Sequence, residues 1–265
     1  MTACLPSMSL ASTQQSALSA YRSPAGLLSE ASLASSVAAA SGGIQRTQHP
    51  IVTGASVLAV KYADGVMLMA DTMGSYGSMG MFKALQRIHQ VNPYTVLGAS
   101  GEYSDLQYIL KLLEQLRIAD FAQADGAVMT PAEVHSYLGR VMYNRRSKVD
   151  PLWNQLITAG FYNGKPFLGM TDMYGSTYEA DLLATGYGLH LAIPLLRKHQ
   201  RNDQTAEEAR KLLEECMKVL FYRDCRTLNS FQVATITKDG ATISKPFSVE
   251  TSWELKRQVQ PFRAD

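Results

Sequence analysis

The sequence predicts an α+β domain in which two antiparallel sheets are packed face to face and helices cover their outer faces. Short apolar runs come in pairs that are separated by turn residues, as in β-hairpins. Between groups of these pairs lie stretches whose apolar residues are three and four positions apart, as in amphipathic helices. The order is strand pairs, two helices, strand pairs, two helices and a last strand pair, which predicts a four-layer αββα sandwich.

Two hairpins are predicted in the first half of the folded region. Their strands and turns are 56–62 with 66–70 around Asp64-Gly65, and 87–91 with 95–100 around Asn92-Pro93. The strands of the first hairpin do not alternate between apolar and polar residues, so we expect both of its faces to be covered. The Gly- and Ser-rich stretch 74–80 between the hairpins is predicted to be a loop.

The helices are indicated by apolar periodicity and by capping boxes. Helical spacing follows Gly101, and the sequences Thr130-Pro131-Ala132-Glu133 and Thr205-Ala206-Glu207-Glu208 each predict a helix start. A short helical stretch is expected at 189–198. The remaining predicted strands are 155–161, 167–171, 178–183, 231–237 and 241–244.

The first 43 residues differ in composition from the rest, because 11 are Ser, 10 are Ala, and only Arg22 and Glu30 are charged. Such a segment cannot bury enough large apolar surface to offset the entropy lost on ordering. We interpret residues 1–46 as a removable pro-segment. A transit peptide is a second interpretation, because the segment is rich in Ser and poor in acidic residues, although it is also poor in Arg.

The rest of the composition excludes several classes of function. The formal net charge of +2 gives no reason to expect nucleic acid or a membrane surface as a partner, and no apolar run is long enough to span a bilayer. The three cysteines, Cys4, Cys216 and Cys225, form no CxxC pair and argue against a disulfide framework. The five histidines lack the spacing of metal ligands, so we expect no metal and no cofactor.

Several motifs resemble those of proteasome β subunits, in collinear order over about residues 47–245. They are Gly54-Ala55 with the strand after it, Ala70-Asp71, Arg87, Gly98-Ala99-Ser100-Gly101, Gly186-Tyr187-Gly188 and Tyr222-Arg223-Asp224. The resemblance implies the N-terminal nucleophile hydrolase fold, with residues 47–245 as the β domain. Within the family, stretches such as Pro151-Leu152-Trp153-Asn154 are similar to the noncatalytic subunit at the seventh position of the β ring.

In active members of this family, a Thr freed by cleavage after a Gly attacks the peptide carbonyl, and its own α-amine acts as the base. The resemblance places Ala55 at the nucleophile position, and alanine has no hydroxyl. Arg87 stands where a Lys is expected, and Tyr187 stands where active members have a Ser. Three positions match the family: Asp71, Gly101 and Asp224. The resemblance therefore implies a noncatalytic subunit in which Arg87 and Asp71 form a buried ion pair.

Without a hydroxyl at residue 55, the chain is not expected to cut its own Gly54–Ala55 bond. The resemblance implies trimming by an active neighbour, and we place this cut between Arg46 and Thr47. It also implies partners among β subunits of the same and the opposite ring and among α-ring subunits, a location in cytoplasm and nucleus, and an extended tail at 246–265 for inter-subunit contact. The alternative function is a cryptic threonine-type hydrolase that uses Thr47, Thr53 or Ser56.

Overall fold

The computed structural model describes residues 49–123 and 128–253, which belong to one compact unit. One sheet has eight strands, which are β1 (Val52–Gly54), β4 (Gly74–Tyr76), β5 (Met79–Phe82), β6 (Ile88–Asn92), β7 (Thr95–Glu102), β8 (Asn154–Tyr162), β9 (Lys165–Thr171) and β10 (Thr177–Glu179). The other has five, which are β2 (Val57–Tyr62), β3 (Gly65–Asp71), β11 (Leu182–Ala184), β12 (Phe231–Thr237) and β13 (Gly240–Ile243). The helices in the described part are α3 (Tyr103–Ala122), α4 (Pro131–Ser147), α5 (Gly188–Leu191), α6 (Ile193–His199) and α7 (Ala206–Arg223).

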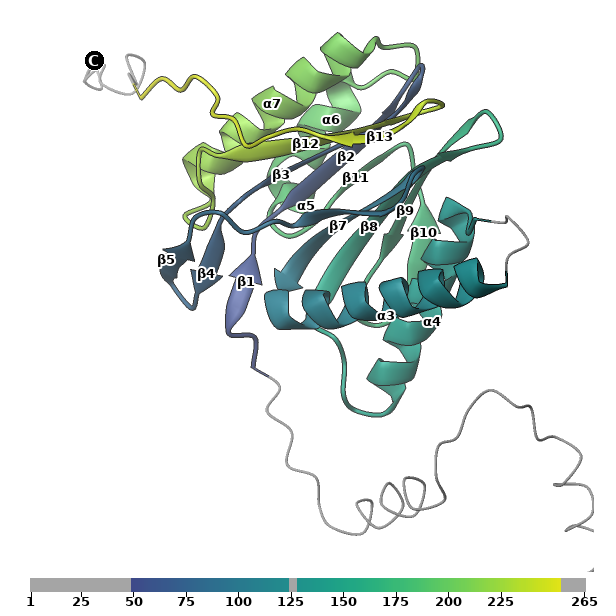
Figure 1. Ribbon diagram of the computed structural model, residues 1–265. Helices are drawn as coiled ribbons and strands as arrows, with labels where there is room; N and C mark the ends of the chain where they lie inside the picture. Colours follow the sequence, from purple (N-terminus) through teal and green to yellow (C-terminus); the bar gives the residue numbers. More distant parts are fainter. Residues whose placement is uncertain (1–48, 124–127, 254–265) are drawn as a thin grey trace, which may run out of the picture. The chain divides into compact units, whose positions relative to one another are not determined.

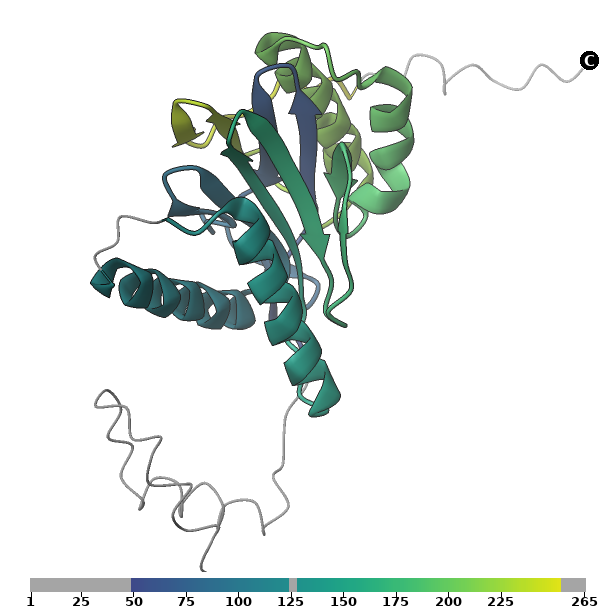
Figure 2. The same ribbon diagram turned by 90° about the vertical axis from the view of Figure 1, so that its right-hand side faces the viewer.

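The elements form four layers, as the sequence predicts (Figure 1). The order of the larger sheet is β10-β9-β8-β7-β1-β4-β5, with β6 also paired to β7, and the smaller sheet runs β11-β2-β3-β12-β13. The strand pairs within both sheets are antiparallel. Figure 2 shows α3 and α4 on one side of the two sheets and α6 and α7 on the other. The αββα sandwich is therefore confirmed.

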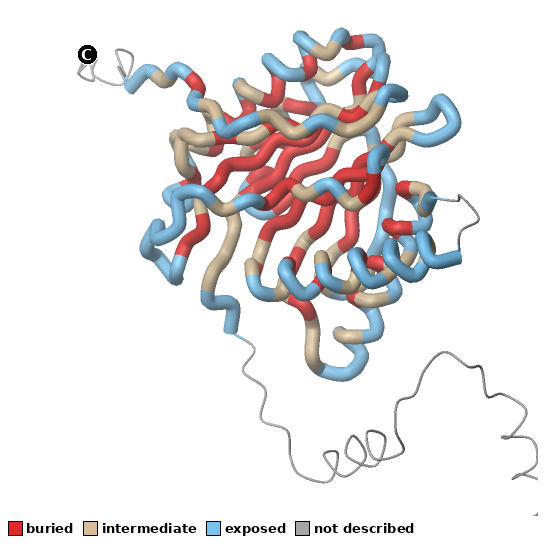
Figure 3. Tube along the Cα trace, viewed as in Figure 1, coloured by how far each residue is buried: buried red, intermediate tan, exposed pale blue. Residues whose placement is uncertain are grey.

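Three apolar cores lie between the four layers. One lies between the sheets, one between the smaller sheet and α5–α7, and one between the larger sheet and the pair α3 and α4. Strand β2 shows why apolar and polar residues do not alternate in the first hairpin. Val57 and Ala59 belong to the core between the sheets, and Leu58 and Val60 belong to the core under α7. Both faces of the central strands are buried (Figure 3). Continuous apolar runs are the expected sequence of such strands.

The capping boxes begin the helices where the sequence predicts them. The Thr130 and Thr205 hydroxyls accept from the Glu133 and Glu208 amides at 3.2 and 3.3 Å, and each Glu carboxylate accepts from the Thr amide in return. The apolar stripe of α7 is buried against the smaller sheet, and Cys216 lies within it. Burial raises the pKa of the Cys216 thiol to about 12, so this side chain is a small core residue and not a reactive thiolate.

Two sequence predictions about the strands are wrong. The stretch 74–80 is not a loop, because β4 and the first two residues of β5 lie within it. Strand β4 pairs with β1, a strand that the sequence does not predict. Glycine and serine have weak β propensity, so here pairing with distant residues overrides the local preference. The predicted single strand at 178–183 divides into β10 and β11, which belong to different sheets.

The first part of the predicted tail packs against the domain. Phe247 exchanges two backbone hydrogen bonds with Phe231 of β12, at 2.8 and 2.9 Å, and Val249 is buried in the core under α7. The Trp253 ring lies edge-on against the rings of Phe221 and Tyr222 on α7. Residues 254–265 of the predicted tail lie outside the described residues. No helix in the described part of the chain is long and apolar enough to cross a membrane.

Candidate functional site

A cavity of about 320 Å³ lies where the start of β2, the end of β7, the start of α5 and the end of α7 meet. Four of the six positions singled out in the sequence line it: Ala55, Gly101, Tyr187 and Asp224. The other two, Asp71 and Arg87, are buried and connect to the cavity through the backbone of Ala55. The structure therefore brings together residues that are spread over 170 positions of the sequence (Asp224 minus Ala55, plus one).

Arg87 is the best connected side chain of the site. Its guanidinium donates to the carbonyl oxygens of Ala55 at 2.6 Å, Ser56 at 3.1 Å and Asp71 at 3.0 Å, and it forms an ion pair with the Asp71 carboxylate. Both side chains of the pair are 1% exposed. An arginine stays protonated at any accessible pH, so Arg87 holds these acceptors in place and cannot pass a proton to or from a reacting group.

Asp71 accepts hydrogen bonds on both carboxylate oxygens. One oxygen faces Arg87, and the other accepts from the backbone amides of Met73 and Leu228, each at 3.3 Å. Burial raises the pKa of the Asp71 carboxyl above its ordinary value, and the Arg87 guanidinium and the two amides act in the opposite direction. The ion pair between Asp71 and Arg87 therefore connects the end of β3, the residue before β6 and the segment between β1 and β2.

Ala55, which the resemblance places at the nucleophile position, carries only a methyl group. The chain also continues through Gly54 into β1, so residue 55 has no free α-amine in this structure. Strand β1 fills the space between β7 and β4, with Gly54 opposite both Gly101 and Gly74. Strand β1 therefore already occupies the edges of β4 and β7 beside residue 55, and an extended peptide cannot pair with them there.

The alternative nucleophiles lack the groups that activation requires. The Ser56 side chain is 2% exposed, and its hydroxyl accepts from the amide of Gly188 at the start of α5, at 2.9 Å. Thr53 lines the cavity, but it is an internal residue of β1 and has no α-amine to act as a base. Thr47 lies outside the described residues.

The remaining positions have structural roles in this chain. Gly101 has φ +95°, and a Cβ atom there would lie 2.1 Å from the carbonyl oxygen of Trp153. The amide of Asp224 donates to the carbonyl of Leu220 at 2.7 Å at the end of α7. Tyr187 lines the same cavity and is 62% exposed.

Two polar residues of this region were missed by the sequence analysis. The Asn154 amide group donates to the carbonyls of Ser100 and Glu102 at 3.2 and 2.8 Å and so holds the end of β7. The buried Glu102 carboxylate accepts from the amides of Ile51 and Val52. An acidic residue at a helix start is a recognisable signal for a cap, but nothing in the sequence relates Glu102 to residues 50 and 51 positions away.

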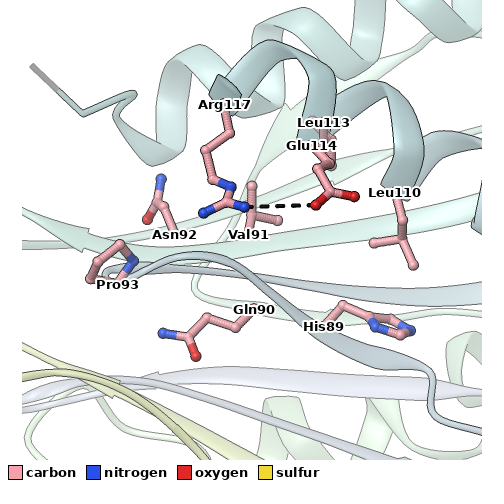
Figure 4. A pocket seen from close by; sticks show the side chains of 9 residues that line it. All are labelled: His89, Gln90, Val91, Asn92, Pro93, Leu110, Leu113, Glu114 and Arg117. Carbon is pink, nitrogen blue, oxygen red and sulfur yellow. Dashed lines mark ion pairs between the residues drawn. The ribbon is translucent and has the colours of Figure 1, made fainter. Parts of the chain in front are cut away.

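A second cavity lies between β6 and α3, away from these residues (Figure 4). Glu114 and Arg117 on α3 point toward one another above β6 and form an exposed ion pair at 3.8 Å. His89 donates from Nε2 to the carbonyl of Gln86 at 3.0 Å, and burial lowers the pKa of this imidazole. Within the described ranges no group of three or more His, Cys, Asp or Glu side chains is placed to hold a metal ion.

The layers and the cavity together define an N-terminal nucleophile hydrolase fold whose site lacks its nucleophile. The chain belongs to the proteasome subunit family, whose pattern matches residues 51–236. It is 48% identical over 223 residues to the proteasome subunit beta type-4 of Xenopus laevis, covering 83% of this chain and 92% of that protein. It is also 48% identical to the beta type-4 subunit of Arabidopsis thaliana, covering 82% and 88%, and 41% identical to the beta type-7 subunit of Saccharomyces cerevisiae, covering 82% and 86%.

Proposed function

We propose that this chain is a noncatalytic β subunit of the proteasome core particle, at the seventh position of the β ring. Its role is geometric: it fills one ring position and contacts β subunits of both rings and subunits of the α ring. There it supports ATP- and ubiquitin-dependent protein degradation by active neighbours, in cytoplasm and nucleus. Family membership supports assembly with other proteasome subunits, and the net charge of +2 fits protein partners better than nucleic acid or a membrane surface.

The observation that carries this proposal is the chemistry around residue 55. Ala55 has no hydroxyl, Arg87 cannot transfer a proton, and β1 occupies the strand position beside the cavity. The cryptic hydrolase would need Thr47, Thr53 or Ser56, and the two of these that are described lack an activating amine. The geometry favours a scaffold over an enzyme.

We also propose that residues 1–46 are a pro-segment that a neighbouring active subunit removes by cutting between Arg46 and Thr47. Strand β1 supports a cut upstream of Val52. A cut after Gly54 would separate β1 from the domain, and β1 is the strand through which β4 and β5 join the larger sheet. The domain proposed to remain runs through residue 245, and the tail follows it to residue 265.

A covalent Thr-directed peptide probe will label the active subunits of an assembled particle and leave this chain unlabelled. Ala55→Thr will not change that result. The new hydroxyl stays in an uncut chain without a free α-amine, and Arg87 still holds the carbonyl of residue 55. Labelling is read on the separated subunits, and the active neighbours in the same particle serve as the positive control.

Labelling of the wild-type chain at Thr47, Thr53 or Ser56 would contradict the noncatalytic assignment and support the hydrolase. Labelling of Ala55→Thr alone would leave the assignment of the wild-type chain in place and show that Arg87 does not block activation. Mapping the labelled peptide separates these outcomes.

Deleting residues 254–265 will slow the joining of half particles, each of which holds one of the two β rings. It will change the free energy of unfolding of the domain by less than about 0.5 kcal/mol. Deleting residues 246–265 is the matched comparison, because it also removes Val249 from the core and the backbone bonds to Phe231. We expect this longer deletion to lower the free energy of unfolding by about 2–4 kcal/mol. Normal assembly of the shorter deletion would show that the tail beyond Trp253 is not an assembly contact.

A further inference from the structure

Glu102 is a buried carboxylate that the proposed function does not use. It is 6% exposed and lies at the end of β7, where it also caps the start of α3. A carboxylate is strongly disfavoured in such a place unless hydrogen bonds compensate for the loss of water. The partners of Glu102 therefore indicate why the side chain is tolerated there.

The two carboxylate oxygens differ in their shorter hydrogen bonds. Oε1 accepts from the hydroxyl of Ser104 at 2.6 Å and from its amide at 3.4 Å, which is a helix cap. Oε2 accepts from the amide of Ile51, and from the amide of Val52 at 3.2 Å. The Val52 amide also lies 3.4 Å from Oε1, so Oε1 serves mainly α3, whereas Oε2 holds the chain segment that leads into β1. Figure 1 shows β1 beside the start of α3.

This contact marks a change in the accessibility of the chain. His49, Pro50 and Ile51 are exposed, whereas the three residues of β1 are partly buried. All of β1 pairs with β4, and Thr53 and Gly54 also pair with β7. A protease needs a stretch of chain that is free of internal hydrogen bonds and can be drawn into its own site. Among the described residues, His49 and Pro50 are exposed and precede this limit, whereas Ile51 and the residues of β1 are held by Glu102 and by the sheet.

We propose that Glu102 sets the downstream limit to which the N-terminal segment can be trimmed, and so determines which residues of that segment stay in the mature subunit. This inference rests on the proposed removal of residues 1–46. A cut between Arg46 and Thr47 leaves residues 47–50 between the new end and the first amide that Glu102 holds. A cut further along requires the protease to extract the amides of Ile51 and Val52 from a buried carboxylate, and then to unpair β1.

The test compares Glu102→Gln with the wild-type chain and with Ser104→Ala in intact purified particles. Ser104→Ala is the matched control, because it removes the hydroxyl on Oε1 and leaves the bonds to Oε2. Intact mass gives the N-terminus of this subunit in each particle, before and after brief digestion with added proteinase K. Hydrogen exchange of the Ile51 and Val52 amides reports the contact directly.

We expect the wild-type and Ser104→Ala chains to keep Ile51 and everything after it, with and without proteinase K. Glu102→Gln is expected to yield additional N-termini between residues 51 and 55 and to speed exchange of the two amides by about 10- to 100-fold. Unchanged N-termini and unchanged exchange in Glu102→Gln would overturn the inference. Equal changes in Ser104→Ala would also overturn it, because they would trace the effect to the helix cap.

Failure of the proposed cut between Arg46 and Thr47 and failure of the inference about Glu102 give different results. If wild-type particles retain residues 1–46, the proposed cut is wrong, but the proteinase K limit and the exchange rates still decide the role of Glu102. If Glu102→Gln does not enter particles, Glu102→Asp takes its place, because it keeps the charge and draws the carboxylate back by one methylene. The same two results, new N-termini and faster exchange, are then required of the aspartate variant.

Discussion

Arg87→Met will lower the free energy of unfolding of the full chain by about 3–5 kcal/mol. The substitution keeps most of the side-chain volume but removes every donor that Arg87 provides. The Asp71 carboxylate is then buried without its cation, and the carbonyls of Ala55 and Ser56 lose their donors. Urea unfolding of the variant and the wild type, followed by circular dichroism, gives the difference in free energy.

Two comparisons separate this effect from a general loss of charge. Arg117→Met removes an exposed ion pair with Glu114, and we expect a change within about 0.5 kcal/mol. The double variant Asp71→Leu with Arg87→Met removes both buried charges, so its loss should be smaller than the sum of the single losses by about 2 kcal/mol or more. A loss below about 1 kcal/mol for Arg87→Met would contradict a structural role for the pair.

The parts of the fold that the sequence predicts correctly rest on local signals. The turn at Asp64-Gly65 and the capping boxes at Thr130 and Thr205 act over a few neighbouring residues, and the structure has a hairpin and two helix starts there. Strand β1 and the β4–β5 hairpin depend instead on pairing between residues about 20 positions apart. Gly74 and Ser75 have no strong preference of their own, so their strand conformation could not be predicted from the local sequence.

The candidate site also has features that the sequence predicts and features that it does not. The resemblance places Ala55, which has no hydroxyl, at the nucleophile position, and it also predicts the pair between Asp71 and Arg87 that the structure contains. The sequence could not predict that Arg87 also binds two carbonyls next to residue 55, because that requires the three-dimensional path of the chain. The role of Glu102 is non-local as well, since its partners Ile51 and Val52 precede it by 51 and 50 positions.

Gly101→Ala is expected to have the second large effect, a loss of more than about 4 kcal/mol in the free energy of unfolding. Residue 101 has φ +95°, a conformation that disfavours any Cβ atom, and the new methyl would lie 2.1 Å from the carbonyl oxygen of Trp153 and 3.1 Å from Cα of Asn154. Both contacts are with backbone atoms of the neighbouring chain segment. The methyl therefore fits only if β7 and β8 separate at this end, where the amide of Glu102 donates to the same Trp153 oxygen at 2.9 Å.

Gly164→Ala is the matched control for this prediction. Its φ of +75° is also in the left-handed region, but no described atom lies within 4 Å of the added Cβ, so we expect a loss of about 1–2 kcal/mol from the backbone conformation alone. Urea unfolding of both variants and their share of assembled particles measure the difference. Equal stability of the two variants would show that β7 and β8 can separate at Gly101 without loss, and that the close approach of Gly101 to Trp153 does not fix this end of the cavity.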